Sequence, residues 1–230
     1  GLVCDMLEIV ASNGGRLVDP VAKRSALSER RSLEAVGWVR DRVIGAMAPR
    51  SVLTYQESES LAIFLLGEAV FHRNWPYAWQ VVNDPKESKV AGRVGVGALP
   101  HFPGGQSVAA LGGWHYGVSA FSTHADEARA FIRFMTSAET QKHFALEASL
   151  APTRSALYED AEIRRRNPEL ADQSAAFRRA MPRPVTPVYP AVSEVLQRFF
   201  SQAIAVRDSD LADLARIADA EIDRYLAWVE

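Results

Sequence analysis

Three stretches decide how this sequence is interpreted: RNWPYAW at residues 73–79, LGGW at 111–114 and PRPVTP at 182–187. They place rigid aromatic rings, paired glycines and prolines on what should be irregular loops. A flat apolar ring with a polar edge suits the face of a pyranose sugar, and paired glycines let backbone N–H groups approach its hydroxyls. The three stretches therefore predict a carbohydrate-binding cleft.

Length and charge indicate a globular protein that does not bind nucleic acid. The 230 residues are 48% hydrophobic, which is enough for one large domain or two lobes. The formal net charge of -2 comes from 26 basic and 28 acidic side chains spread along the chain. Nucleic-acid binding needs a concentrated basic surface. We interpret the one dense basic cluster, at residues 164–166, as a solvated helix face.

The single cysteine, Cys4, leaves neither a disulfide pair nor a cysteine-based zinc site, and we expect no metal and no cofactor. Its apolar neighbours predict a buried small residue and not a catalytic thiol. No apolar run approaches the roughly 18 residues of a membrane span. The chain opens on GLVCDMLE, with no initiating methionine and no signal-peptide pattern, so we expect its N-terminal part to be missing.

Apolar periodicity predicts a mostly helical chain with a few short strands. Helical spacing runs over residues 2–11, 32–47, 56–66, around 128–135, and over 161–166, 170–180, 190–206 and 209–229. Thr136 and Glu139 have the spacing of a capping box for a further helix that ends near residue 147. Strands are expected at 68–73, 94–99 and 115–119. This pattern favours an α/β or α+β lobe.

Four segments, in order along the chain, carry a family resemblance. They are GEAVFHRNWPY at 67–77, LGGW at 111–114, PTR at 152–154 and PRPVTP at 182–187. They resemble the C-terminal part of extracellular sugar-binding proteins of ABC transporters, solute-binding family 1, of the trehalose/maltose-binding type. The resemblance covers essentially the whole chain, and the pairing of NWPY with GGW is its most specific element.

The resemblance implies an α/β fold of the periplasmic-binding-protein type (type II), in which two lobes enclose a ligand. Residues 1–98 would form the first part of the C-terminal lobe, residues 99–151 a crossover segment of the N-terminal lobe, and residues 152–230 the helical end of the C-terminal lobe. The implied partners are a small sugar and the transmembrane subunits of an ABC permease. The implied location is the periplasmic or extracellular face of a bacterial membrane, and no catalytic residue is implied.

The resemblance also assigns ligand-binding residues: Trp75 and Tyr77 on one wall, Gly112, Gly113 and Trp114 on the opposite wall, and an arginine for the sugar hydroxyls at Arg183. The chemistry agrees, because aromatic rings stack on sugars and a guanidinium offers several fixed donors. Core packing is the alternative for the two tryptophans. We expect Trp38, Trp79 and Trp228 to take part in core or interlobe packing, and we leave His115 and Arg154 unassigned.

Two other functions stay open at this point. A glycoside hydrolase would need two carboxylates about 5 to 10 Å apart, one of them protonated. Glu68 and Asp84 are the acids near the aromatic stretches, and neither has neighbours typical of a catalytic acid. The second alternative is a truncated, non-binding interaction module whose uncovered apolar surface would meet a partner.

Overall fold

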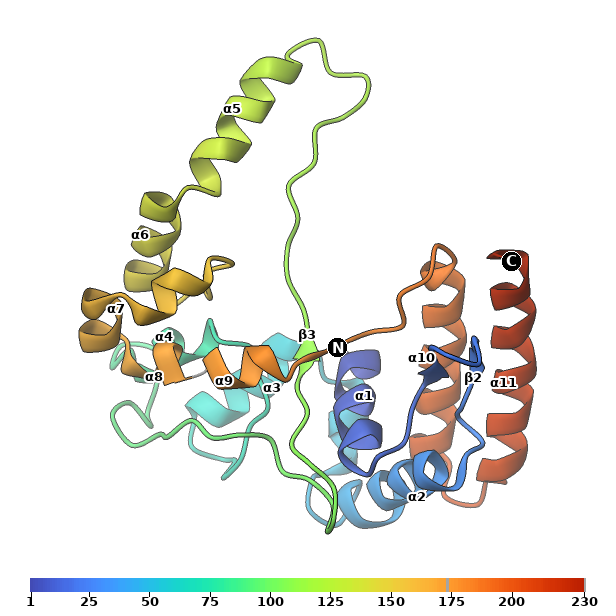
Figure 1. The fold of residues 1–230 in the computed structure, drawn as a ribbon. Helices are drawn as coiled ribbons and strands as arrows, with labels where there is room; N and C mark the ends of the chain where they lie inside the picture. Colours follow the sequence, from blue (N-terminus) through green and yellow to red (C-terminus); the bar gives the residue numbers. More distant parts are fainter. Residues whose placement is uncertain (173, 230) are drawn as a thin grey trace. The chain divides into compact units, whose positions relative to one another are not determined.

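The computed structural model describes residues 1–172 and 174–229, which form two units (Figure 1). The first unit comprises Gly1–Ser60, Ala98–Leu111 and the chain from Arg179 onward; the second comprises Leu61–Gly97 and Gly112–Arg178. Among the described residues, no helix has both the length and the hydropathy that a bilayer crossing requires.

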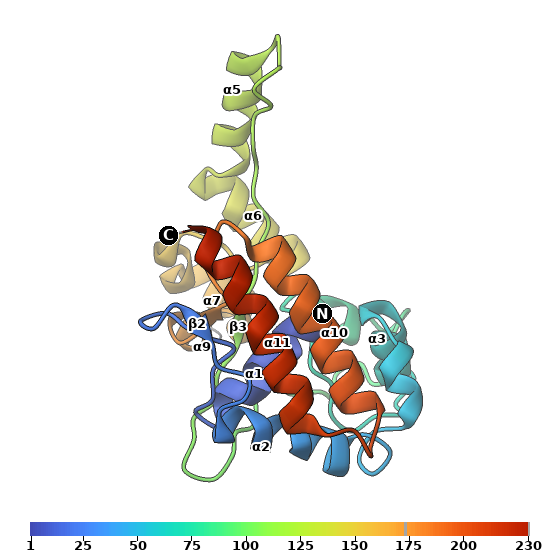
Figure 2. The same cartoon turned by 90° about the vertical axis from the view of Figure 1, so that its right-hand side faces the viewer.

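Four helices build the core of the first unit: α1 (Leu2–Ser12), α2 (Arg30–Trp38), α10 (Tyr189–Ala205) and α11 (Leu211–Leu226). Helices α10 and α11 lie side by side in both views (Figure 1 and Figure 2). The apolar stripe predicted for α10, including Val192, Leu196 and Phe199, is buried, because apolar side chains at helical spacing face one side. Cys4 is buried on α1, as predicted.

The first unit also holds two short two-stranded ladders. Strands β1 (Val18–Asp19) and β2 (Arg24–Ser25) pair antiparallel, and β3 (Ala110–Leu111) and β4 (Met181–Pro182) pair parallel. Its remaining elements are a π-helix, η1 (Val39–Val43), and 3₁₀ turns η2 (Arg50–Thr54) and η4 (Ala227–Val229).

The prediction of one helix over residues 32–47 is wrong at its end. Helix α2 stops at Trp38, a π-helical turn follows, and Ile44 is already extended. Gly45 then adopts a φ of 81°, a left-handed conformation that glycine tolerates best, and the helix cannot continue through it. The apolar spacing beyond residue 43 is therefore incidental.

The second unit is a chain of short helices with long irregular connections. Its elements are α3 (Glu57–Leu65), α4 (Ala78–Asn83), α5 (Ala125–Met135), α6 (Ala138–Ala148), η3 (Ser155–Glu159), α7 (Ala161–Arg166), α8 (Pro168–Asp172) and α9 (Ser174–Arg178). One apolar cluster gathers Leu61, Phe64, Ala78 and Val82, and another gathers Ala145, Leu157, Ile163 and Leu170.

Several predicted boundaries in the second unit shift. The N-cap of α6 is Ser137 and not Thr136: its Oγ accepts from the Thr140 N–H at 3.2 Å. Helix α8 begins at Pro168, where proline suits a first turn, two residues before the predicted start of the 170–180 helix. That prediction also covers residue 173, which lies outside the described residues.

The strands predicted at 68–73, 94–99 and 115–119 are wrong, since all three segments are irregular. A β-rich segment becomes a strand only when a neighbouring strand takes up its N–H and C=O groups. Within residues 1–172 and 174–229, none of these segments forms such a ladder. The last of them nevertheless carries two residues of the pocket described below, His115 and Tyr116.

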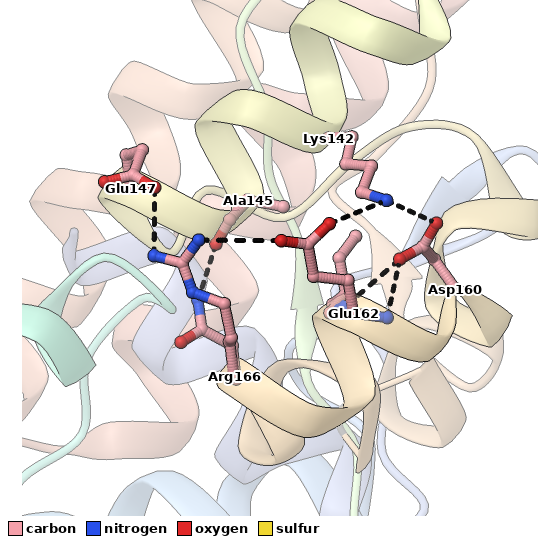
Figure 3. Close-up of polar contacts among 8 residues, drawn as sticks. Lys142, Ala145, Glu147, Asp160, Glu162 and Arg166 are labelled. Atoms are coloured by element: carbon pink, nitrogen blue, oxygen red, sulfur yellow. Dashed lines mark hydrogen bonds and ion pairs between the residues drawn. The ribbon is translucent and has the colours of Figure 1, made fainter.

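An ion-pair network ties α6 to α7 (Figure 3). Lys142 Nζ lies 3.0 Å from carboxylate oxygens of both Asp160 and Glu162. Arg166 reaches Glu147 on α6 at 3.0 Å and Glu162 at 3.8 Å. Asp160 also caps α7 by accepting from two of its backbone N–H groups. The network fixes α6, one wall of the pocket described below.

Candidate ligand-binding site

The indole of Trp75 lies against the backbone of Gly112. A Cβ atom at residue 112 would come within 2.9 Å of Cη2 and 3.0 Å of Cζ3 of that ring. Only glycine fits this distance without a shift of the ring or the backbone. The structure thus brings together two predicted site residues that lie far apart in the sequence, both in the second unit.

The surroundings of Trp75 hold its ring in place while leaving it half-buried. Its backbone N–H donates to Asn74 Oδ1 at 2.7 Å, and the Arg73 guanidinium lies 4.2 Å from the ring centroid, a cation–π geometry. Asn74 Nδ2 is buried and has no hydrogen-bond partner among the described residues. A sugar that stacks on the face covered by Arg73 would have to displace that side chain.

A histidine that precedes this segment has its pKa shifted toward the neutral form. His72 stacks on Phe64 with 5.2 Å between ring centroids. Burial, and to a smaller extent the charge of Arg73, lowers the pKa of His72 below its ordinary 6.5. The shift therefore favours the uncharged ring beside Arg73.

Trp114 stands at the mouth of a pocket of about 350 Å³ in the second unit, and its side chain is 99% exposed. The walls come from the irregular segment after Gly113, the end of α5, helix α6 and the loop that follows it. The lining residues are Trp114, His115, Tyr116, Ile132, Met135, Thr136, Gln141, Phe144, Leu150, Ala151, Pro152 and Thr153. This mainly apolar lining with a few polar groups is typical of small-molecule sites.

A buried glutamine holds the loop wall of this pocket. Gln141 Oε1 accepts from the Thr153 N–H at 2.9 Å, and its Nε2 donates to Thr153 Oγ1 at 3.0 Å. Arg154 Nε donates to the Thr136 carbonyl at 2.8 Å. Gln141 was not among the predicted site residues, although the PTR segment at 152–154, to which it bonds, offered a signal for it. The hydrogen bond of Arg154 links the loop to Thr136 at the end of α5.

Tyr158 also holds the loop that contains Pro152 and Thr153. Its hydroxyl donates to the Pro152 carbonyl at 2.9 Å. Burial raises the pKa of Tyr158 to about 12, so the hydroxyl keeps its proton at any physiological pH. The loop wall is thus anchored on both sides by hydrogen bonds that do not depend on neutral-range titration.

The two glycines of the LGGW stretch have different surroundings. At Gly113 an added Cβ would meet no atom within 4 Å, in contrast to the tight fit at Gly112. The backbone at Gly113 is therefore open to an approaching molecule. Tyr77, by comparison, is half-buried and packs on the cluster that contains Leu61 and Phe64. Its role as a stacking platform stays a prediction.

Arg183 belongs to the first unit, where it follows β4 directly. Its guanidinium lies 5.3 Å from the centroid of the Tyr189 ring, and the side chain is exposed. The Tyr189 hydroxyl is buried and has no hydrogen-bond partner among the described residues. Trp228, expected in core or interlobe packing, is exposed and meets Tyr225 edge-on, because η4 carries it beyond the end of α11.

The part of the chain that the structure describes holds no group of three or more His, Cys, Asp or Glu residues that could bind a metal ion. The site chemistry that remains consists of aromatic faces, open backbone and hydrogen-bonding side chains.

Comparison with known proteins places the chain in a family. The model of the bacterial extracellular solute-binding protein family matches residues 5–142, and the chain belongs to this family. A probable ABC transporter-binding protein of Deinococcus radiodurans is 36% identical over 207 residues, which are 90% of this chain and 49% of that protein. The chain thus spans about half the length of this curated relative.

Solved structures agree with that assignment. Maltose-bound MalE3 of T. maritima superposes with a TM-score of 0.88 at 36% identity, over 100% of this chain and 58% of that one. The GacH receptor of Streptomyces glaucescens, crystallised with acarbose, has a TM-score of 0.85 at 23% identity and covers 99% of this chain and 58% of its own. The second likeness concerns the fold alone.

These matches confirm the resemblance inferred from the NWPY and GGW stretches and the periplasmic-binding-protein fold class. Members of the family bind solutes and are not enzymes, so the glycoside hydrolase alternative is set aside. The family is extracellular by its description.

Proposed function

We propose that this chain is the ligand-binding part of an ABC sugar importer, which captures a disaccharide such as maltose or trehalose at the periplasmic or extracellular face and delivers it to the permease. The observation that carries the proposal is the seating of Trp75 on Gly112, two residues before the exposed Trp114 at the mouth of a pocket. Two residues span at most about 7 Å of backbone, so the backbone of Trp114 lies near the contact between Trp75 and Gly112. The pocket itself is lined by Trp114 and not by Trp75.

The apolar part of recognition falls to Trp114. The Trp114 indole is 99% exposed, so its apolar surface is hydrated, which is unfavourable. The apolar face of a pyranose would remove much of that surface from water. Tyr116, Phe144 and Leu150 extend the apolar surface into the pocket. The maltose bound by MalE3 is a ligand of this chemical kind.

In the second unit, the polar part of recognition falls to open backbone; for Arg183, in the first unit, a role toward sugar hydroxyls stays a prediction. Gly113 leaves room for hydroxyls to approach main-chain N–H and C=O groups, and a guanidinium can hold two hydroxyls in a fixed geometry. Capture would then follow the general scheme for two-lobed binders, in which the ligand favours a closed form and shifts the population toward it. The lobe assignment of residues 1–98, 99–151 and 152–230 stays a prediction within this proposal.

Titration calorimetry tests the proposal. Maltose and trehalose are titrated separately into the full chain, with galactose-based lactose as a stereochemical comparison. We expect saturable heat with at least one α-linked disaccharide and its loss in Trp114→Ala. Trp228→Ala is the matched control, because it removes an exposed indole from a helix end outside the candidate site.

Absence of heat with every sugar, or equal binding by wild type and Trp114→Ala, would contradict the proposal. Absence of heat would favour the alternative of a non-binding interaction module, whereas equal binding would place the ligand away from Trp114. That alternative draws on other exposed aromatic residues of the second unit, Phe71 and Phe121.

A further inference from the structure

Glu8 is a buried carboxylate in the middle of α1, with a relative exposure of 6%. Its Oε1 accepts a hydrogen bond from the backbone N–H of Ala110 at 2.9 Å, a contact between residues 102 positions apart. Burying a carboxylate is costly unless hydrogen bonds compensate, and bonds from backbone N–H groups to a charged acceptor are among the strong ones. The contact therefore holds β3 firmly on α1.

The Ala110 N–H that donates to Glu8 lies on the edge of β3 opposite to β4. Met181 N–H donates to the Ala109 carbonyl at 2.8 Å, and Ala110 and Leu111 stand opposite Met181 and Pro182. In a strand, alternate residues direct their N–H and C=O groups to opposite edges. Since Ala109 faces β4, Ala110 faces the other way, and Glu8 replaces a neighbouring strand there.

The ladder that Glu8 supports runs up to the residue before Arg183, because Leu111 stands opposite Pro182. Met181 N–H donates to β3, so Pro182 faces away from β3 and its missing N–H removes no bond from this ladder. Arg183 is the next residue, and it lies over Tyr189 at the start of α10. The position of Arg183 thus depends on where β3 holds β4, and the position of β3 depends on Glu8.

We propose that Glu8 is a positioning residue for Arg183. By supplying an acceptor oxygen to Ala110, it fixes β3 on α1 and, through the parallel ladder, the place where Arg183 leaves β4. The inference rests on the proposed function in so far as Arg183 donates to sugar hydroxyls. Every residue in this relay belongs to the first unit.

The test is a double-mutant cycle in the full chain, with maltose as the probe. Glu8→Asp shortens the side chain by one methylene and withdraws the acceptor, whereas Glu8→Gln keeps both the length and an acceptor oxygen. We expect Glu8→Asp to weaken maltose binding by about tenfold, Glu8→Gln by less than about threefold, and Glu8→Asp to have no further effect in an Arg183→Ala background. Ser32→Ala, at a buried hydroxyl that bonds Arg16, is the stability control and should be additive with Arg183→Ala.

A second readout does not depend on sugar. Amide hydrogen exchange of the segments 108–111 and 181–183 should accelerate in Glu8→Asp and stay close to wild type in Glu8→Gln. If wild type binds no maltose, the proposed function fails while the exchange result still decides the role of Glu8. Unchanged exchange, additive effects on affinity, or equal losses in Glu8→Gln and Glu8→Asp would each overturn the inference. If Glu8→Asp does not fold, Glu8→Met, which removes the acceptor at similar side-chain length, takes its place with the same expected results.

Discussion

Two tryptophan–glycine pairs in the second unit contrast sharply. In the first pair, Trp75 rests on Gly112 so closely that a Cβ has no room. In the second, Trp114 is 99% exposed and Gly113 has open space around it. The same residue types are thus a packed support in one place and an uncovered surface in the other. The packed pair can preorganise a site, and the open pair is available to contact a ligand.

The contrast indicates that an exposed residue of the site affects ligand affinity alone, whereas a packed residue also affects the stability of the fold. A side chain that contacts little in the folded protein contributes little to folding, so its removal should affect only binding. A glycine pressed against a ring contributes to both. The following experiments test this division, from the largest expected effect to the smallest.

Trp114→Ala should weaken maltose binding most, by about 2 to 4 kcal/mol, as is typical of an aromatic residue at a binding hot spot. Its thermal stability should match wild type because the side chain is exposed. Calorimetry and thermal unfolding measure the two quantities. A drop in stability comparable to the loss in binding would remove the contrast.

Gly112→Ala should destabilise the protein by about 1 to 3 kcal/mol, since the new methyl group would overlap the Trp75 ring. Gly113→Ala is its matched control, and its stability should stay within about 0.5 kcal/mol of wild type. Urea unfolding gives both values. Equal stabilities for the two variants would mean that Trp75 can move aside freely.

The same two variants sharpen the contrast when sugar is added. Gly113→Ala should bind maltose more weakly than wild type if the ligand occupies the open space around that backbone, although its fold is unaffected. Calorimetry on Gly113→Ala answers this point. Unchanged affinity would move the ligand away from Gly113.

Gln141→Ala should destabilise the second unit by about 1 to 3 kcal/mol, because it leaves the Thr153 N–H without its acceptor. Gln141→Glu keeps that acceptor and loses the Nε2 donor, which bonds Thr153 Oγ1 and the Thr136 carbonyl, so it should be milder. Urea unfolding compares them. Comparison with Gly112→Ala shows whether the loop held by Gln141 contributes as much to stability as the packing of Trp75 on Gly112.

The smallest expected effect is a pH dependence from the network on α6 and α7. Hydrogen bonds from Lys142 lower the pKa of Asp160 and of Glu162 below their ordinary 3.8 and 4.5. Their contribution is fully present above about pH 4.5 and is lost as the pH falls through the lowered values. The same bonds raise the pKa of Lys142 above 10.5, so its contribution fades only in strong alkali.

Lys142→Met should therefore flatten the acid limb of stability, measured as urea midpoints between pH 3 and pH 7. Lys86→Met serves as the control, since Lys86 is an exposed lysine with its backbone at a turn beside Asp84. The change will be modest, because solvent screens exposed ion pairs. An unaltered acid limb in Lys142→Met would assign the pH dependence to other carboxylates.

Much of the helical structure could be predicted from local pattern. The stripe of Val192, Leu196 and Phe199 predicted α10, and the paired glycines at 14 and 15 predicted the end of α1. Both are local patterns, because helix hydrogen bonds join residues four apart. The strands could not be predicted in this way. The run at 94–99 has strand composition, yet a strand is defined by a partner that its own sequence does not name.

The candidate site shows the same difference between what a local pattern predicts and what depends on distant segments. The sequence by itself determined which residues have the chemistry for a sugar, namely the aromatic rings of 75 and 114, the paired glycines and Arg183, because that chemistry belongs to each side chain. Only the tertiary structure decided that Trp75 packs on Gly112, that Trp114 stays uncovered and that Gln141 holds the neighbouring loop. These are distances between segments far apart in the chain, and they follow from how the whole unit packs.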